Sequence, residues 1–211
     1  MAIDLFDSDL FKTSSYVGGE WMPESSNRLA VTNPATGDVI AQVATVDASG
    51  TLNAIAAAHD AMQSWQDVPA KARAQVLRRW FDLMMAHQED LAIIMTTEQG
   101  KALAESRGEV AYGAAFMEWF GEQAKRIDGD VIPAPSSDKR VVCIKQPVGV
   151  VAAITPWNFP NAMIARKAAP ALAAGCSIVI KPASETPLSA LAMAELAERA
   201  GVQARSAARG P

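Results

Sequence analysis

Three polar side chains in the second half of the sequence have types and spacings that suit ligand binding. Asn158 follows an apolar run that ends at Ile154, and Lys181 follows the apolar run Cys176–Ile180. A neutral amide donates hydrogen bonds without titrating, and an unpaired lysine beside a buried strand would be costly. Arg166 lies eight residues after Asn158, about 12 Å along a regular helix, and a guanidinium binds a carboxylate through two parallel hydrogen bonds. These residues favour a site for an organic ligand that carries an anionic group.

The elements around these residues predict how they are positioned. Val148–Ile154 and Cys176–Ile180 are short apolar runs, typical of strands buried on both faces. Thr155–Pro160 interrupts the first run with two prolines, and a helical pattern follows. Thr186-Pro187 has the residue types that begin a further helix. This β-α-β-α series predicts an α/β fold, namely an incomplete doubly wound, parallel, Rossmann-like sheet, in which ligands bind beyond the carboxyl ends of the strands.

Upstream of this series, the pattern predicts short strands followed by helices. Residues 16–45 combine short apolar runs with turn signals, and Gly18-Gly19 can form a tight hairpin. Apolar residues then recur at helical spacing. The expected helices are Asp47–Trp65, a segment that starts at Pro69, Gln88–Glu98 and Lys101–Lys125.

After Gly129 the sequence changes character. DVIPAPSSDKR is a Pro/Ser-rich connector, and Arg140–Gln146 is expected to form a strand, which alone would be an edge with unpaired backbone groups. Residues 202–211 have no periodic apolar face, which predicts a disordered tail. A frameshift and a genuine terminal extension both explain such a tail.

Composition narrows the class of protein. The 211 residues are 50% hydrophobic with a formal net charge of -4, which gives no reason to expect nucleic acid or a membrane as partner. No basic, apolar leader and no run of roughly 18 apolar residues is apparent, so a cytoplasmic protein is expected. Cys143, Cys176, His59 and His87 are too few and too scattered for a disulfide framework or a metal site. Both cysteines are expected to be small apolar fillers.

The motif TPWNFP at 155–160, followed by a helix, a strand and KPAS at 181–184, resembles the aldehyde dehydrogenase superfamily. The wider string is most similar to the succinate-semialdehyde dehydrogenase branch, and the resemblance covers residues 12–201. It implies an oxidoreductase whose full-length relatives are homo-oligomers. It divides the chain into an N-terminal part of the cofactor-binding domain (1–137), an oligomerisation-arm strand (138–147), the β-α-β-α core (148–201) and the aberrant tail (202–211), with the catalytic domain absent.

In the resembled family a cysteine thiolate attacks the aldehyde, a hydride passes to the nicotinamide, and water releases the thioester. The oxyanion formed on attack needs a preorganised donor, and the resemblance gives this catalytic role to Asn158. The alternative for Asn158 is that it only caps the helix that follows it. The alternative for Lys181 is that its side chain only extends into solvent. The residues that the resemblance assigns to the cofactor are Ile154, Thr155, Pro156, Trp157, Asn158, Lys181, Pro182, Ala183 and Ser184.

Ser184 bears on which cofactor binds. Relatives that prefer NAD often place a carboxylate at this position, where it binds both ribose hydroxyls and repels a 2′-phosphate. A serine leaves room for the phosphate and can donate a hydrogen bond to it, which favours NADP. Glu185 can reintroduce negative charge, so NAD stays an alternative.

Arg166 bears on the substrate. The gap between it and Asn158 suits a short chain with an aldehyde at one end and a carboxylate at the other, which favours succinate semialdehyde. Glutarate semialdehyde is the alternative, and so is a surface arginine that pairs with an acid. Phe159 and Met163 either form walls of the substrate pocket or pack in the core, and Phe116 or Phe120 either lines a tunnel or is core.

The family's nucleophilic cysteine and general-base glutamate lie beyond the last residue of this sequence. The expectation is therefore an enzyme by family whose N-terminal half, as given, does not turn over. A truncated, non-catalytic product or a half-domain that binds nucleotide is the alternative.

Overall fold

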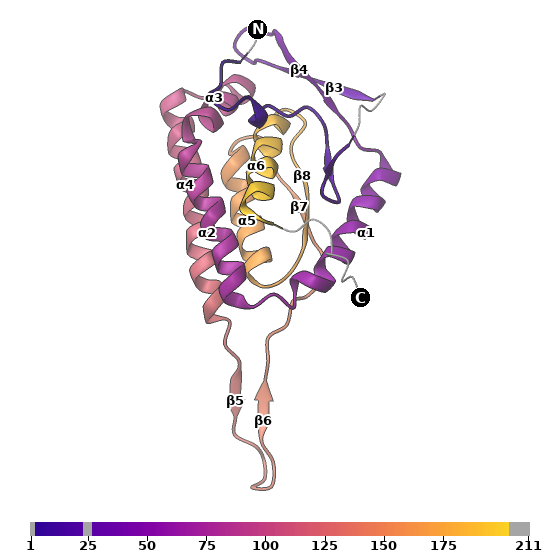
Figure 1. Cartoon of the computed structure of the whole chain (residues 1–211), viewed down its shortest axis with the longest axis vertical. Coiled ribbons are helices and arrows are strands. Elements are labelled where there is room, and N and C mark those ends of the chain that lie inside the picture. The colour runs from indigo at the N-terminus through magenta and orange to yellow at the C-terminus, as the bar shows by residue number, and fades with distance from the viewer. Residues whose placement is uncertain (1–2, 23–26, 203–211) are drawn as a thin grey trace.

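The structure is a computed structural model that describes residues 3–22 and 27–202 (Figure 1). In chain order its elements are a 3-10 helix at Ser8–Leu10, β1 (Tyr16–Val17), β2 (Glu20–Trp21), β3 (Arg28–Thr32), β4 (Val39–Ala44), α1 (Ala48–Trp65), α2 (Ala70–Ala86), α3 (Gln88–Gln99), α4 (Leu103–Gln123), a 3-10 helix at Ala124–Arg126, β5 (Asp130–Ile132), β6 (Val141–Cys143), β7 (Val151–Ile154), α5 (Pro160–Ala173), β8 (Ile178–Lys181) and α6 (Pro187–Ala200).

The two strands of the β-α-β-α series pair in parallel. Ile154, the last residue of β7, lies opposite Lys181, the last residue of β8. The backbone N–H of Thr155 donates to the carbonyl of Lys181 at 3.2 Å. The carboxyl ends of both strands therefore meet at one edge, and the predicted α/β fold class is confirmed.

Helices form two layers beside this strand pair (Figure 1). α5 packs on β7 and β8, and α6 packs beside α5. α2, α3 and α4 cover α5 and α6 on the side away from the strands, while α1 contacts β8. The interior between these layers is apolar. Its largest fully buried side chains include Leu77, Met84, Leu91, Met117, Leu188 and Leu196.

The contact between α2 and α4 depends on Gly121. A Cβ added there would lie 3.3 Å from the Leu77 Cβ and 3.4 Å from the Ala74 carbonyl oxygen, whereas a Cβ at Gly108 on the same helix meets nothing within 4 Å. We expect Gly121→Val to lower the free energy of unfolding by about 1–3 kcal/mol, because the extra methyl groups overpack this contact. Gly108→Val is the control and is expected to leave stability unchanged or slightly raised. Urea unfolding measures both, and equal effects would contradict the close contact.

The strand expected at Val148–Ile154 is shorter than predicted and less buried. Strand β7 begins at Val151, and the expectation of burial on both faces is wrong, because Ile154 is 76% exposed and Val148 is 93% exposed. Ala153, by contrast, is buried against the helices. In the part of the chain that the structure describes, one face of the strand pair is covered by α5 and the other is largely open.

The second strand begins two residues later than predicted. Cys176 was expected to open it, but β8 begins at Ile178. The reason is the end of α5, where the N–H of Gly175 donates to the Leu172 carbonyl and the N–H of Cys176 donates to the Ala171 carbonyl. Cys176 therefore belongs to the helix C-terminus, and it is buried as expected.

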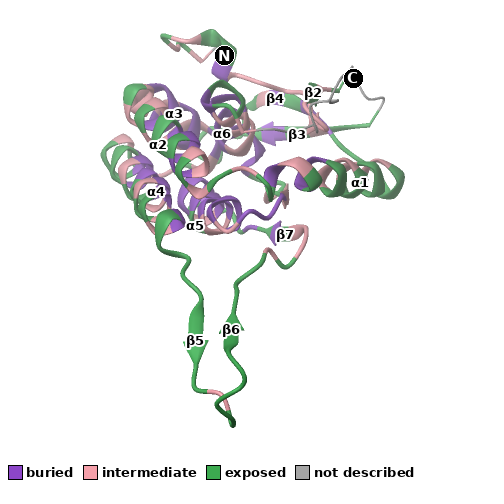
Figure 2. Ribbon diagram, turned by 60° about the horizontal axis from the view of Figure 1, so that its bottom comes forward, coloured by how far each residue is buried: buried purple, intermediate pink, exposed green. Residues whose placement is uncertain are grey.

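A hairpin arm projects from the end of the helical layers. The Pro/Ser-rich segment was expected to be a connector, but β5 pairs with β6 in an antiparallel ladder, with Asp130 opposite Cys143. The hairpin that contains β6 therefore begins at Asp130. Figure 2 shows it exposed along most of its length, and Val131 is 75% and Val142 64% exposed. Cys143 is exposed too, so its expected role as an apolar filler is wrong.

The N-terminal segments follow the prediction more closely. β1 and β2 pair as the expected hairpin around Gly18-Gly19, and β3 pairs with β4. No helix among the described residues is long and apolar enough to cross a membrane. Of the predicted tail, residues 203–211 lie outside the described part of the chain.

Candidate functional site

The predicted ligand-binding residues gather at the carboxyl ends of β7 and β8. The turn 155–159 leaves β7 and leads into α5, and Trp157, Asn158 and Phe159 in this turn are exposed. Lys181, at the end of β8, and Ser184, in the turn that follows, are exposed too. The structure therefore brings together both clusters that sequence analysis assigned to a cofactor, because the parallel pairing places the two turns side by side.

The first turn of α5 is held by a buried carboxylate. Glu109 of α4 is 3% exposed, and its Oε1 accepts the backbone N–H of Asn161 at 2.9 Å and of Ala162 at 3.2 Å. Its Oε2 contacts the ammonium of Lys101. A negative charge at a helix N-terminus is favourable, since the helix dipole and the free N–H groups both attract it.

The first turn of α6 is held in the same way. Both oxygens of Glu98, at the end of α3, accept backbone N–H groups, from Leu188 at 2.8 Å and from Ser189 at 2.7 Å. Burial nevertheless raises the pKa of Glu98 to about 7, because removal of the carboxylate from water outweighs these hydrogen bonds.

Sequence analysis missed both glutamates. Their helical spacing is the signal that could have found them, because each continues a buried stripe. Glu98 lies four residues after the buried Ile94, and Glu109 lies four residues before the buried Gly113. An acid on the buried face of a helix needs a partner, and a neighbouring helix N-terminus can supply one.

These two carboxylates restrict where the phosphates of a dinucleotide can bind. Helix N-termini commonly bind phosphate through their first N–H groups. Pro160 and Pro187 open α5 and α6 without an N–H, and the next two N–H groups of each helix donate to Glu109 or Glu98. The first free N–H groups of α5 and α6 are therefore already bonded to carboxylates, and the polar groups exposed at the strand ends belong to the segments 155–159 and 181–186.

Lys181, the last residue of β8, has no carboxylate within ion-pair distance in the described residues 3–22 and 27–202. Its Nζ donates to the carbonyl oxygen of Pro182 at 3.1 Å, a contact that folds the side chain back over its own turn. Ser184 and Glu185 follow on the same exposed turn. The turn thus offers an ammonium and a hydroxyl to an anionic group, with one carboxylate adjacent.

Arg166 lies on the outer face of α5 among apolar side chains. Its guanidinium carbon is 5.6 Å from the centre of the Phe116 ring, and its Nη1 is 4.0 Å from the Sδ of Met163. Tyr112 meets the edge of Phe116 with ring centres 5.0 Å apart. Within residues 3–22 and 27–202, no carboxylate lies within ion-pair distance of Arg166. The structure therefore does not support the alternative that this arginine pairs with a nearby acid.

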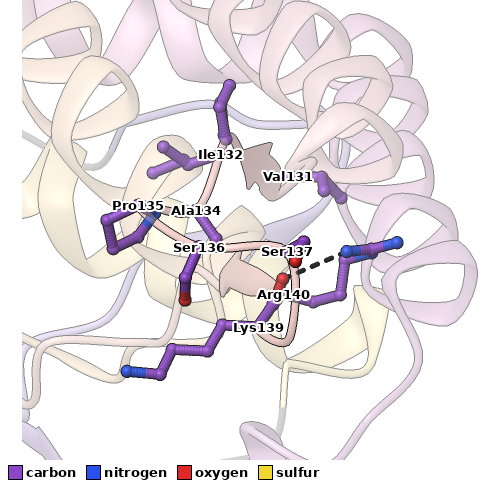
Figure 3. Close-up of a pocket in the computed structure, with 9 residues that line it drawn as sticks. Val131, Ile132, Ala134, Pro135, Ser136, Ser137, Lys139 and Arg140 are labelled. Atoms are coloured by element: carbon purple, nitrogen blue, oxygen red, sulfur yellow. Dashed lines mark hydrogen bonds between the residues drawn. The ribbon is translucent and has the colours of Figure 1, made fainter.

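The two cysteines lie at the other end of the strand pair. Cys176 precedes β8, and Cys143 lies on the arm. A pocket does occur on the arm, lined by residues 131–140 (Figure 3). Its walls come from one hairpin, where Arg140 donates to the Lys139 carbonyl at 3.1 Å. This pocket is remote from Asn158 and contributes nothing to the site at the strand ends.

Comparisons with known proteins agree with the geometry. The model of the aldehyde dehydrogenase family matches residues 21–206. Over 201 residues the chain is 59% identical to a glutarate-semialdehyde dehydrogenase of Pseudomonas aeruginosa and 58% identical to an NADP(+) succinate-semialdehyde dehydrogenase of Escherichia coli. A crystal structure of an E. coli NADP-dependent enzyme superposes with a TM-score of 0.93 at 57% sequence identity.

The similarity covers most of this chain and less than half of each relative. All three alignments include 95% of this chain and 42% of the other protein. The chain thus spans 42% of the length of the relatives that it matches.

Proposed function

This chain belongs to the aldehyde dehydrogenase family, and on that premise we propose that it supplies the cofactor-binding and aldehyde-positioning part of an enzyme that oxidises a short aldehyde bearing a carboxylate. Succinate semialdehyde is the proposed substrate, and NADP is the proposed cofactor. The single observation that carries this proposal is Arg166, an exposed guanidinium that has no acidic partner among the described residues and lies eight residues after Asn158.

Asn158 is proposed to bind the aldehyde oxygen. Attack on the carbonyl converts it to an oxyanion, which a neutral amide N–H stabilises when it is already in place. The side chain is exposed at the start of α5 and does not titrate, so its donor is present at every working pH. NADP, when bound, accepts the hydride; this chain contributes the exposed turns at the ends of β7 and β8 that would hold it.

Arg166 is proposed to bind the substrate's carboxylate. Side chains on a helix lean toward its N-terminus, so the guanidinium extends from Arg166 back toward Asn158. Phe116 and Met163 beside it would exclude water and strengthen the ion pair. A five-carbon semialdehyde also satisfies this arrangement, and relatives named for glutarate and for succinate semialdehyde are almost equally similar.

The preference for NADP rests on Ser184 and gives a testable prediction. We expect Ser184→Glu to weaken NADP binding by about tenfold or more, because a carboxylate repels the 2′-phosphate, while NAD binding is kept or improved. Isothermal titration of both nucleotides measures the change. Ser184→Ala is the control and loses only a hydrogen bond, so its effect is smaller. An equal loss of both nucleotides in Ser184→Glu would contradict the assignment.

The arm is proposed to serve assembly. It exposes the apolar residues Val131, Val142 and Ile144, the last of which is 68% exposed, and nothing in the described part of the chain covers them. A homo-oligomer of the whole protein, as the family resemblance implies, would bury this surface.

The proposed function is tested on the purified 211-residue chain by thermal melting and by an aldehyde oxidation assay. NADP is expected to raise the melting temperature more than NAD does, and added succinate to raise it further. Arg166→Gln should keep the effect of NADP and lose the effect of succinate. The absence of any nucleotide effect would contradict the proposal.

No turnover of succinate or glutarate semialdehyde is expected from the chain alone, because neither cysteine lies at the Asn158 end of the strands. The nucleophile is proposed to come from the part of the family sequence that lies outside the aligned residues. Turnover would show that Cys143 or Cys176 acts as nucleophile after all.

A further inference from the structure

Lys101 makes three contacts that converge on the turn containing Asn158. It lies between α3 and α4, and its side chain is only 10% exposed. Its Nζ donates to the backbone carbonyl oxygen of Asn158 at 2.9 Å and contacts the Glu109 carboxylate. The same Nζ lies 4.4 Å from the centre of the Phe159 ring. One ammonium therefore contacts the backbone of Asn158, the side chain of the next residue and a buried acid.

Glu109 extends these contacts to the other side of the turn. While its Oε2 contacts Lys101, its Oε1 accepts the N–H groups of Asn161 and Ala162. The Lys101–Glu109 pair thus holds a carbonyl before Phe159-Pro160 and two N–H groups after it. The turn between these points cannot shift without breaking at least one charge-assisted hydrogen bond.

Among the described residues, the turn 157–159 has one further backbone hydrogen bond, in which the Phe159 carbonyl accepts the N–H of Met163 at 2.9 Å. Residues 157–159 belong to no helix or strand, and Pro160 has no N–H to donate. The Cα–Cβ bond of Asn158 has a set direction relative to its own backbone. A carbonyl held toward α4 therefore fixes the direction in which the side chain leaves the turn and limits the positions that its amide reaches through χ1 and χ2.

From these contacts we propose that Lys101 is a positioning residue for Asn158, acting with Glu109 to hold the turn in the one conformation that presents the amide to the aldehyde oxygen. This inference rests on the proposed function, in which Asn158 stabilises the oxyanion. Preorganisation of such a donor is what gives it catalytic value, since a donor that must first be ordered loses part of its effect.

Nuclear magnetic resonance on the full 211-residue chain tests the contact directly. In the wild type, the Lys101 ammonium protons are expected to exchange slowly with water, and a scalar coupling across the hydrogen bond should connect Lys101 Nζ to the Asn158 carbonyl carbon. A rapidly exchanging ammonium without this coupling would overturn the proposal, and this measurement needs no variant to fold.

Variants then separate positioning from stability. Lys101→Met is expected to raise the exchange rates of the Asn161 and Ala162 amide protons at least tenfold. It should also lower the order parameter of the Asn158 backbone N–H from near 0.85, the value of a rigid backbone, to below about 0.6. Lys101→Arg keeps the positive charge, so its amide exchange rates and its Asn158 order parameter should lie close to those of the wild type. The matched control is Arg107→Gln, which removes a cation of α4 that pairs with Glu89 and does not contact the turn.

An unchanged Asn158 order parameter in Lys101→Met, alongside lower global stability, would reduce Lys101 to a structural role and overturn the proposal. None of these measurements includes nucleotide or aldehyde. A chain that failed to bind NADP would therefore contradict the proposed function and leave the result on Lys101 intact.

Discussion

Glu98→Gln is expected to change how the stability of this protein depends on pH. Burial raises the pKa of Glu98 to about 7 in the folded chain, above the ordinary value of 4.5. The folded state therefore holds a proton that the unfolded state releases between these two values. The stability that this proton contributes is fully present below pH 4.5 and is lost as the pH rises through 7. The free energy of unfolding falls by about 3 kcal/mol in total over this range.

Urea unfolding of the wild type and the variant between pH 4.5 and 8.5 measures this effect. At pH 5 the variant is expected to be less stable, because its amide places an N–H beside one of the two backbone N–H groups that Glu98 accepts. As the pH rises, the wild type should lose this advantage. Glu105→Gln, an exposed position at the start of α4, is the control and should follow the wild type at every pH.

The absence of this trend would contradict the raised pKa. If the difference in stability between the wild type and Glu98→Gln stayed constant between pH 4.5 and 8.5, the two N–H donors and the dipole of α6 would outweigh burial and keep the carboxylate ionised. The pKa of Glu98 would then lie at or below its ordinary value, and α6 would be held by a fixed negative charge.

Both helices of the β-α-β-α core are held by side chains at each end. Acids from α3 and α4 accept their first N–H groups, as described above. At the other end of α5, Arg73 Nε donates to the Ala173 carbonyl at 3.1 Å, and Trp65 Nε1 donates to the Leu172 carbonyl at 3.1 Å. Arg79 Nε donates to the Ala200 carbonyl at the end of α6, at 2.8 Å. The negative charge of Glu109 matches the dipole at the N-terminus of α5, and the positive charges of Arg73 and Arg79 match the dipoles at the C-termini of α5 and α6. Glu98 matches the dipole at the N-terminus of α6 when it is ionised.

The sequence alone predicted the strands and helices of this core, but it did not predict the side-chain contacts at the helix ends. Apolar runs, prolines and glycine predicted β7, α5, β8 and α6, because strand burial, helix capping and turn chemistry are local. The same motifs identified Asn158, Lys181 and Arg166 as ligand-binding candidates. The partners of Glu98 and Glu109 lie 90 and 52 residues away, and local spacing says nothing about which buried acid meets which helix.

The arm shows the same limit. A Pro/Ser-rich stretch is typical of a connector, yet Asp130–Ile132 pairs with Val141–Cys143. The apolar residues of this segment suit a strand, but pairing was not predicted because the matching run lies beyond an intervening loop. Exposure of Cys143 was missed for the same reason: a cysteine between Val142 and Ile144 is buried only if another part of the protein covers the strand.

Glu109→Gln is expected to lower the free energy of unfolding by about 3 kcal/mol, the loss typical when one member of a buried ion pair is removed. Its carboxylate is 1% exposed and serves an ammonium and two backbone N–H groups at once. A glutamine has one acceptor oxygen, so it cannot accept from both the Lys101 ammonium and the N–H groups at the start of α5. Its own amide N–H groups would face one of these two sets of donors.

Chemical unfolding at neutral pH measures this loss, and Glu89→Gln is its matched control. Glu89 forms a bidentate pair with Arg107 in the same pair of helices, but both side chains are nearly half exposed, so water replaces the lost contact. The control should therefore unfold close to the wild type. If both variants lost the same small amount, the Lys101–Glu109 pair would be no stronger than a surface pair, and α5 would be anchored by its apolar face alone.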